Sequence, residues 1–180
     1  LDLSLAYRQG TGAFGALNAP EEAFGEGLSR AKIVTYELGL ALPFKLADQP
    51  LRYNGDIRGQ WSHSPLAIST DRFSIGGRYT VRGFDGESVL MAERGFLIRN
   101  DLSLALGQSG QELYLGVDHG RVGGPSAELL VGRHLTGAVI GLRGSYRKLH
   151  YDVFIGGPLD KPENFQTRHR TGGFNLTLNF

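Results

Sequence analysis

Several things are missing from this sequence of 180 residues. It has no cysteine, so disulfide frameworks and cysteine-ligated zinc sites are excluded. No apolar run approaches about 20 residues, the length that a transmembrane helix needs. Neither sign of charge dominates, because 19 lysines and arginines oppose 18 acidic residues, and we therefore expect no nucleic acid partner. What is present is glycine, with 27 scattered residues, which is typical of a chain with many turns and closely spaced strands.

Motifs for catalysis are also lacking. The sequence contains no Gly-x-Ser-x-Gly, no P-loop and no dinucleotide fingerprint. Its histidines have no partner four residues away and no carboxylate at ligand spacing; they are His63, His119, His134, His150 and His169. Carboxylates such as Asp56 and Glu37 could pair across strands, but Arg52 and Arg58 balance them, which indicates a structural charge network. We therefore predict no enzyme activity, no cofactor and no metal.

Apolar and polar residues alternate with a period of two over nine segments, which predicts nine strands. The segments are 1–7, 32–43, 51–62, 72–80, 96–104, 112–122, 135–144, 151–159 and 171–180. Most are about 9 to 11 residues long, as a tilted strand needs to cross a bilayer. Their polar faces are rich in Arg, Asp, Asn, Thr, Ser and Gly, as in an aqueous lumen. This pattern predicts an all-β fold, a transmembrane antiparallel β-barrel; a soluble β-sandwich is the alternative.

One arginine stands out between two of these strands. Val81-Arg82-Gly83-Phe84 lies at the first bend of a long loop, and Asp85-Gly86 follows as a second turn signal. An arginine between two flexible points, beside strands with charged faces, is placed to reach a charged group. The alternative is a solvated loop whose arginine contacts nothing.

Four stretches resemble one family of outer-membrane proteins. They are Gly76 to Phe84, Glu93 to Gly95, Asp118 to Val122 and Gly141 to Gly144. They look like the C-terminal barrel of two-partner secretion transporters, the TpsB or haemolysin secretion/activation (ShlB/FhaC/HecB) family. Val-Arg-Gly-Phe in a long loop is the most specific element of this resemblance, which extends over essentially all of the chain.

The resemblance implies a domain organisation and a function. Residues 1–180 would be the C-terminal part, about nine strands, of a sixteen-stranded barrel, with the sixth extracellular loop at about 81–93. The POTRA domains, plug helix and first strands of the family would lie outside this chain, which we expect to be a fragment. The implied function is a pore in the bacterial outer membrane that secretes a large partner exoprotein: a haemolysin, an adhesin or a contact-dependent toxin. A BamA-type insertase and a general porin are the alternatives.

The family's arginine-to-aspartate contact maps onto Arg82 and Asp118. Asp118 lies on the polar face of its strand, and Asp101, also on a polar face, is the competing partner. If desolvated, such a pair would cost about 3 to 5 kcal/mol to break; if exposed to water, only about 0 to 1 kcal/mol. Gly83 would then provide a backbone angle, and Phe84 would pack against the lumen wall. Together with Val81, these residues form the predicted latch.

Two further groups of residues are predicted to act in transport and assembly. The pore lining is expected to comprise Arg52, Asn54, Asp56, Arg58, Gln60, Arg72, Arg78, Arg99 and Asp101. Mixed charge on such a lining suits a conduit that tolerates many sequences. The alternating chain end looks like the signal read by the barrel-assembly machinery; it comprises Phe174, Leu176, Leu178 and Phe180. Any amphipathic edge strand could show such positions, which is the alternative. Besides the exoprotein, the expected partners are outer-membrane lipid and that machinery.

Overall fold

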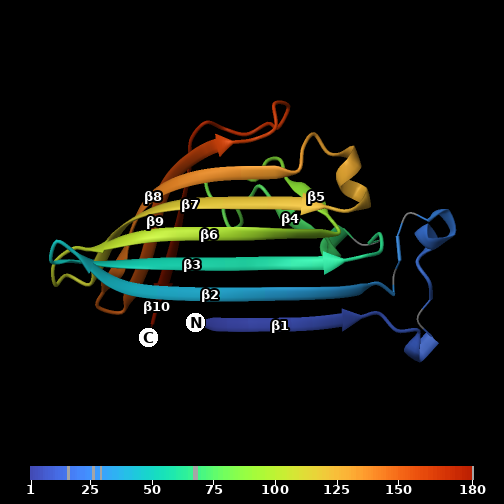
Figure 1. The fold of residues 1–180 in the computed structure, drawn as a ribbon, viewed down its shortest axis with the longest axis horizontal. Coiled ribbons are helices and arrows are strands. Elements are labelled where there is room, and N and C mark those ends of the chain that lie inside the picture. Colours follow the sequence, from blue (N-terminus) through green and yellow to red (C-terminus); the bar gives the residue numbers. More distant parts are fainter. Residues whose placement is uncertain (16, 26, 29, 67–68, 180) are drawn as a thin grey trace.

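A curved antiparallel sheet of eight strands holds a long loop on its concave side (Figure 1). The computed structural model describes residues 1–15, 17–25, 27–28, 30–66 and 69–179. The wall strands, in spatial order, are β1 (Asp2–Gln9), β2 (Lys32–Leu46), β3 (Gln49–Ser62), β6 (Arg94–Ala105), β7 (Gln111–Gly123), β8 (His134–Tyr146), β9 (Leu149–Asp160) and β10 (Thr171–Leu178). The short 3₁₀ helices are η1 (Ala13–Gly15), η2 (Pro20–Phe24), η3 (Ser69–Asp71) and η4 (Pro125–Leu129). The predicted all-β, antiparallel architecture is thus confirmed.

Short turns gather at one end of the sheet and long connections at the other (Figure 1). Ala47 and Asp48 join β2 to β3 with φ angles of 47° and 64°, the left-handed pair that a tight hairpin turn requires. At the opposite end, β3 and β6 are joined by residues 63–93, and β9 and β10 by residues 161–170. In outer-membrane barrels the short turns face the periplasm and the long loops face outward.

The predicted strand over 72–80 was wrong. Only β4 (Phe73–Ile75) is extended there, and it pairs with β5 (Leu90–Ala92) in a separate two-stranded sheet inside the loop. The alternation continues past Ile75 only in sequence, because Thr80 closes a turn. Its Oγ1 accepts the backbone N–H groups of Gly76 and Gly77 at 3.1 and 2.9 Å. The wall therefore has eight strands rather than nine, and the connection that carries Arg82 begins at residue 63.

The two faces of the sheet differ in chemistry. On the outer face, large apolar side chains are exposed along successive strands, for example Leu115, Ile155 and Leu176. The inner face carries the polar residues, and strand register aligns them: Asn54 lies opposite Asp101, and Arg99 opposite Asp118. An extended apolar surface of this kind marks contact with lipid or with another apolar partner.

The hydrophobic core lies between the loop and the inner face of the wall. Its buried members are Ile75, Val81, Phe84, Leu90, Ala92, Leu97, Val122, Ala127, Leu135 and Phe165. Five of these come from the loop between β3 and β6, so the loop is packed as a folded unit and not as a solvated hairpin.

The sheet is open, with β1 and β10 as its edge strands. Among the described residues, no helix is long and apolar enough to cross a membrane. In lipid, unpaired backbone groups at a sheet edge are strongly unfavourable.

Candidate functional site

The loop turns at Arg82 because the residues on either side fix its backbone. Thr80 closes the preceding turn, and its backbone carbonyl accepts the Arg99 Nε–H at 3.0 Å. Gly83 has φ +102°, a conformation that L side chains rarely adopt, and a Cβ there would approach the Gly157 carbonyl oxygen to 2.5 Å. The backbone at position 83 therefore has the angle for which the sequence analysis expected a glycine. The result is an arginine aimed at the wall.

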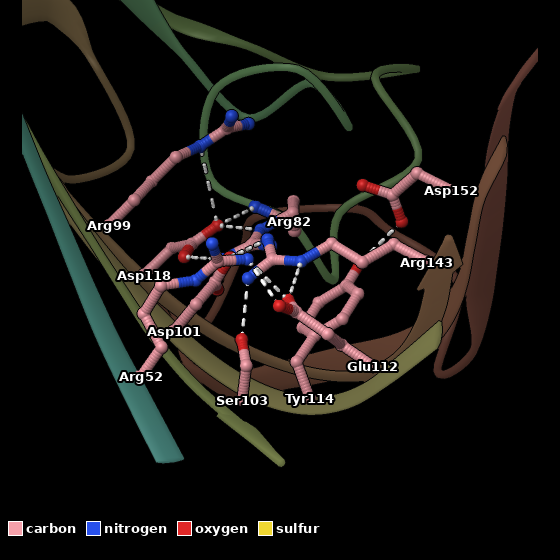
Figure 2. Close-up of polar contacts among 10 residues, drawn as sticks. All are labelled: Arg52, Arg82, Arg99, Asp101, Ser103, Glu112, Tyr114, Asp118, Arg143 and Asp152. Atoms are coloured by element: carbon pink, nitrogen blue, oxygen red, sulfur yellow. Dashed lines mark hydrogen bonds and ion pairs between the residues drawn. The ribbon is translucent and has the colours of Figure 1, made fainter. Parts of the chain in front are cut away.

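Arg82 and Asp118 form a buried ion pair on the inner face of β7 (Figure 2). The Arg82 Nε–H donates to Asp118 Oδ2 at 2.7 Å and Nη2 donates to Oδ1 at 2.6 Å. The backbone N–H of Arg82 adds a third bond to Oδ2, at 2.9 Å. Asp118 is fully buried and Arg82 is 7% exposed. A two-pronged, desolvated pair of this kind fixes both position and orientation of the loop.

Asp101 is a second partner of Arg82 and not a competitor. Arg82 Nη2 also donates to Asp101 Oδ1 at 2.6 Å, from the neighbouring strand β6. Burial opposes the charged form of Arg82, but the hydrogen bonds to Asp118 and Asp101 raise its pKa above the ordinary value. The guanidinium therefore stays charged and bridges β6 and β7.

The charge network continues toward the short turns. Arg143 on β8 donates to Asp101 at 3.3 Å, to Glu112 at 3.0 Å and to the Ser103 hydroxyl at 2.5 Å. Arg52 on β3 reaches the same Glu112 at 2.5 and 2.6 Å. These side chains come from four neighbouring strands of the inner face, so the network ties the wall together across β3, β6, β7 and β8 (Figure 2).

Tyr114 lies between two guanidinium groups of this network. Its ring centre is 4.9 Å from Arg143 Cζ and 5.8 Å from Arg82 Cζ, and its hydroxyl donates to Asp152 Oδ1 at 2.7 Å. The ten residues drawn in Figure 2 include four arginines and four carboxylates, so their formal charges cancel. The members of this network that are buried, Asp118 and Arg82 above all, are stable as charges only because they are paired.

Glycines of the wall make room for the loop. A Cβ at Gly116 would lie 2.7 Å from both Arg82 Nη2 and Asp101 Oδ1, and a Cβ at Gly137 would collide with the Arg82 carbonyl oxygen. Gly120 provides the same clearance for Ile75 and Val81, at 2.9 Å each. The backbone of β7 and β8 can therefore approach the loop closely only because these positions lack side chains.

The rest of the predicted latch is apolar and fully buried. Val81 and Phe84 belong to the core cluster, and Phe84 meets Phe165 of the connection between β9 and β10 edge-on, with ring centres 5.8 Å apart. Beside it, Asp85 Oδ2 accepts the backbone N–H of Arg168 at 2.9 Å. The loop is thus held at Arg82 by charge and at Phe84 by an aromatic contact with a second long connection.

The structure divides the predicted pore-lining residues into two groups. Arg52, Asn54, Asp56, Arg58, Gln60, Arg99 and Asp101 lie on the inner face of β3 and β6, as their shared register shows. Cavities of about 510 and 420 Å³ lie along this face; Asp56 lines both, together with Arg58 in the first and Asn54 in the second.

Arg72 and Arg78 lie in the loop and not on a wall strand, so the strand assigned to them was wrong. Arg72 donates to the Leu66 carbonyl oxygen at 2.9 Å and lies 3.9 Å from the buried Glu93. Arg78 is exposed in the turn that Thr80 closes.

Of the predicted assembly signal, Phe174, Leu176 and Leu178 are exposed on one face of the edge strand β10. The fourth member, Phe180, lies outside the described residues.

Several residues of the site were not singled out from the sequence. Two of them, Glu112 and Tyr114, share the inward parity of Asp118 on β7. The other two lie opposite these in the register: Arg143 opposite Glu112, and Ser103 opposite Tyr114. Strand parity is the signal that could have identified all four. Glu93 has no such signal. It is fully buried, and it accepts the backbone N–H of Ser126 at 3.1 Å and the hydroxyl of the same residue at 2.5 Å. In the part of the chain that the structure describes, no three His, Cys, Asp or Glu side chains are grouped as a metal site.

Comparison with known proteins identifies relatives over the whole chain. The model of the haemolysin secretion/activation protein family ShlB/FhaC/HecB matches residues 1–144. Outer membrane transporter CdiB-2 of Burkholderia pseudomallei (strain 1026b) is 43% identical over 183 residues, which is 99% of this chain and 31% of that protein. Outer membrane transporter CdiB of Dickeya dadantii (strain 3937) is 26% identical, over 97% of this chain and 31% of the relative. The chain thus spans about a third of the length of these relatives.

Solved structures agree with this assignment. CdiB from Acinetobacter baumannii, at 37% identity, superposes with a TM-score of 0.76 over 83% of this chain and 27% of that one. CdiB from Escherichia coli, at 20% identity, shares the fold with a TM-score of 0.78 over 98% of this chain and 33% of its own. The chain belongs to the haemolysin secretion/activation (ShlB/FhaC/HecB) family and forms part of a β-barrel of the bacterial outer membrane.

Proposed function

We propose that this chain is the C-terminal half-wall of a transporter that secretes a large partner exoprotein across the outer membrane. The observation that carries the proposal is the folded loop inside the wall, fixed by the buried pair of Arg82 with Asp118. The lumen is occupied by an ordered element, and its free part is lined by side chains of both signs such as Asp56 and Arg58. Such a lining binds no single kind of segment tightly, which suits passage of an unfolded chain by conduction, without catalysis.

The remaining parts of the proposal concern the missing half and the partners. The eight strands described would occupy the last positions of a sixteen-stranded barrel, and upstream strands would pair with β1 and β10 to close it. The exposed apolar outer face would contact outer-membrane lipid. Phe174, Leu176, Leu178 and Phe180 would be recognised by the barrel-assembly machinery during insertion.

The proposal is tested by secretion. Cells that carry the full-length protein and the large exoprotein encoded beside it should release that exoprotein into the medium, and cells without the transporter should retain it. If other barrels fall in abundance when the protein is removed, while the exoprotein is still secreted, the insertase function is supported instead. If the main loss is in uptake of small solutes, the porin function is supported.

A further inference from the structure

A pocket on the outer rim of the wall is lined by three arginines that the charge network of the lumen does not include. The pocket has a volume of about 480 Å³, and its lining includes Arg94, Arg121, Arg133 and Glu128. Within the described residues, none of the three guanidinium groups forms an ion pair or a hydrogen bond with another side chain. The chain as a whole has a net charge of only +1, so this concentration of positive charge is local.

Strand parity places Arg94 and Arg121 on the outside of the wall, and Arg133, exposed in the connection between β7 and β8, lines the same pocket. Val122 and Leu135 are buried on the inner face, so their neighbours Arg121 and His134, which lie opposite each other in the register, face outward. Arg94 lies next in sequence to the buried Glu93 and stacks on the exposed Trp61, with Cζ 4.9 Å from the ring centre. The pocket is therefore open to whatever surrounds the barrel.

The height of the pocket matches the boundary of the membrane. Below Arg121, the same face of β7 carries Val117, Leu115 and Leu113, all exposed and apolar. At about 3.4 Å per residue and a tilt of about 40°, the eight residue-to-residue steps from Leu113 to Arg121 rise roughly 21 Å, close to the apolar band of about 25 Å in such barrels. Trp61, an amphipathic ring typical of the interface, lies beside the same end. The arginines thus stand where lipid headgroups begin.

Arginine and phosphate are complementary at this position. The three guanidinium groups and the carboxylate of Glu128 give the pocket a net formal charge of +2, and the pocket faces the headgroup layer at the long-loop end. That end faces outward in outer-membrane barrels, and the outer leaflet there carries the phosphate groups of lipopolysaccharide. We propose that Arg94, Arg121 and Arg133 form a binding site for a phosphate group of an outer-leaflet lipid. The orientation of the barrel in the membrane, with the long loops on the outside, rests on the function proposed above.

The test uses the full-length transporter in detergent micelles, with lipid A as the probe and thermal unfolding as the readout. Bisphosphorylated lipid A should raise the Tm of the wild type in a saturable way, whereas lipid A without its phosphates should not. Replacing the three arginines by glutamine should weaken the apparent affinity about 100-fold, equivalent to about 3 kcal/mol. A matched variant with Lys45→Gln, Arg147→Gln and Lys148→Gln removes the same charge from exposed positions at the short-turn end and should bind as the wild type.

Three results would overturn the proposal: unchanged affinity in the arginine variant, equal loss in the matched variant, or an equal Tm shift with inorganic phosphate alone, which would make the pocket a site for free anions. The Tm measured without lipid shows whether each variant is folded. If the triple variant is unfolded, the single variant Arg121→Gln replaces it in the binding test, and its affinity for lipid A should be about fivefold weaker than that of the wild type. Secretion measured in the same variants reports the transport function separately, so either proposal can fail alone.

Discussion

Truncation of Arg82 provides the sharpest test of how the loop is held. Arg82→Ala removes three side-chain hydrogen bonds, two to Asp118 and one to Asp101. It leaves Asp118 fully buried, with one backbone N–H at 2.9 Å and the Arg99 guanidinium at 3.7 Å as its remaining partners. Breaking a buried pair by removing one member costs about 3 to 5 kcal/mol, because the other charge stays desolvated. We expect a loss of unfolding free energy in this range.

A double-mutant cycle isolates the pair from the lost packing. Arg82→Ala, Asp118→Ala and the double variant of the full-length barrel would be unfolded by urea in micelles, and the coupling energy should be about 2 to 3 kcal/mol. Arg58→Ala is the matched control, because its pair with Glu37, at 3.2 Å, is more than half exposed on both sides. That change should cost no more than about 1 kcal/mol. If Arg82→Ala costs no more than Arg58→Ala, the loop is not held by this pair.

Three further predictions follow from the contacts of the loop. Gly137→Ala places a Cβ against the Arg82 carbonyl oxygen and should destabilise the barrel by about 1 to 3 kcal/mol in the same unfolding assay; an unchanged midpoint would contradict the close approach. Phe84→Ala, at a fully buried position, should cost about 3 to 5 kcal/mol and Phe84→Leu clearly less; equal costs would refute the packing role. Slight burial opposes ionisation of Asp85, but backbone N–H groups, that of Arg168 among them, lower its pKa below 3.8. Its contact therefore contributes stability above that pH and loses it only as the pH falls through the lowered value. Distances between spin labels on the two connections should be constant from pH 8 to about 4.5, and a change near pH 6 would contradict this.

Parity along strands indicated which way the carboxylates of the site face. Asp118 and Asp101 alternate with apolar residues, so their inward direction followed from the period of two, and the position of Arg82 between two turn signals followed from local chemistry. The number of carboxylates that one guanidinium bridges did not follow. It depends on the stagger of β6 against β7, which sets Asp101 opposite Gly116 and lets Arg82 reach past that glycine.

The period of two misled where a loop is itself packed. Phe73 and Ile75 alternate with polar residues because they insert between the loop and the wall, and not because the segment continues as a wall strand. Glu93 was missed for a related reason. Its partner Ser126 is 33 residues away, on a connection whose path no local pattern specifies. Contacts between two long loops are set by tertiary packing, which the periodicity of a short segment does not predict.

The most direct test of the central claim is secretion of the exoprotein by cells that carry the full-length transporter with Arg82→Ala, with the amount of barrel in the outer membrane measured in parallel. The account predicts that the barrel is present at a reduced but measurable level and that secretion per barrel falls well below that of the wild type, while Lys45→Gln, at an exposed position of the short-turn end, behaves as the wild type. Secretion per barrel equal to the wild type would contradict it, because a loop fixed in the lumen by Arg82 would then have no part in transport.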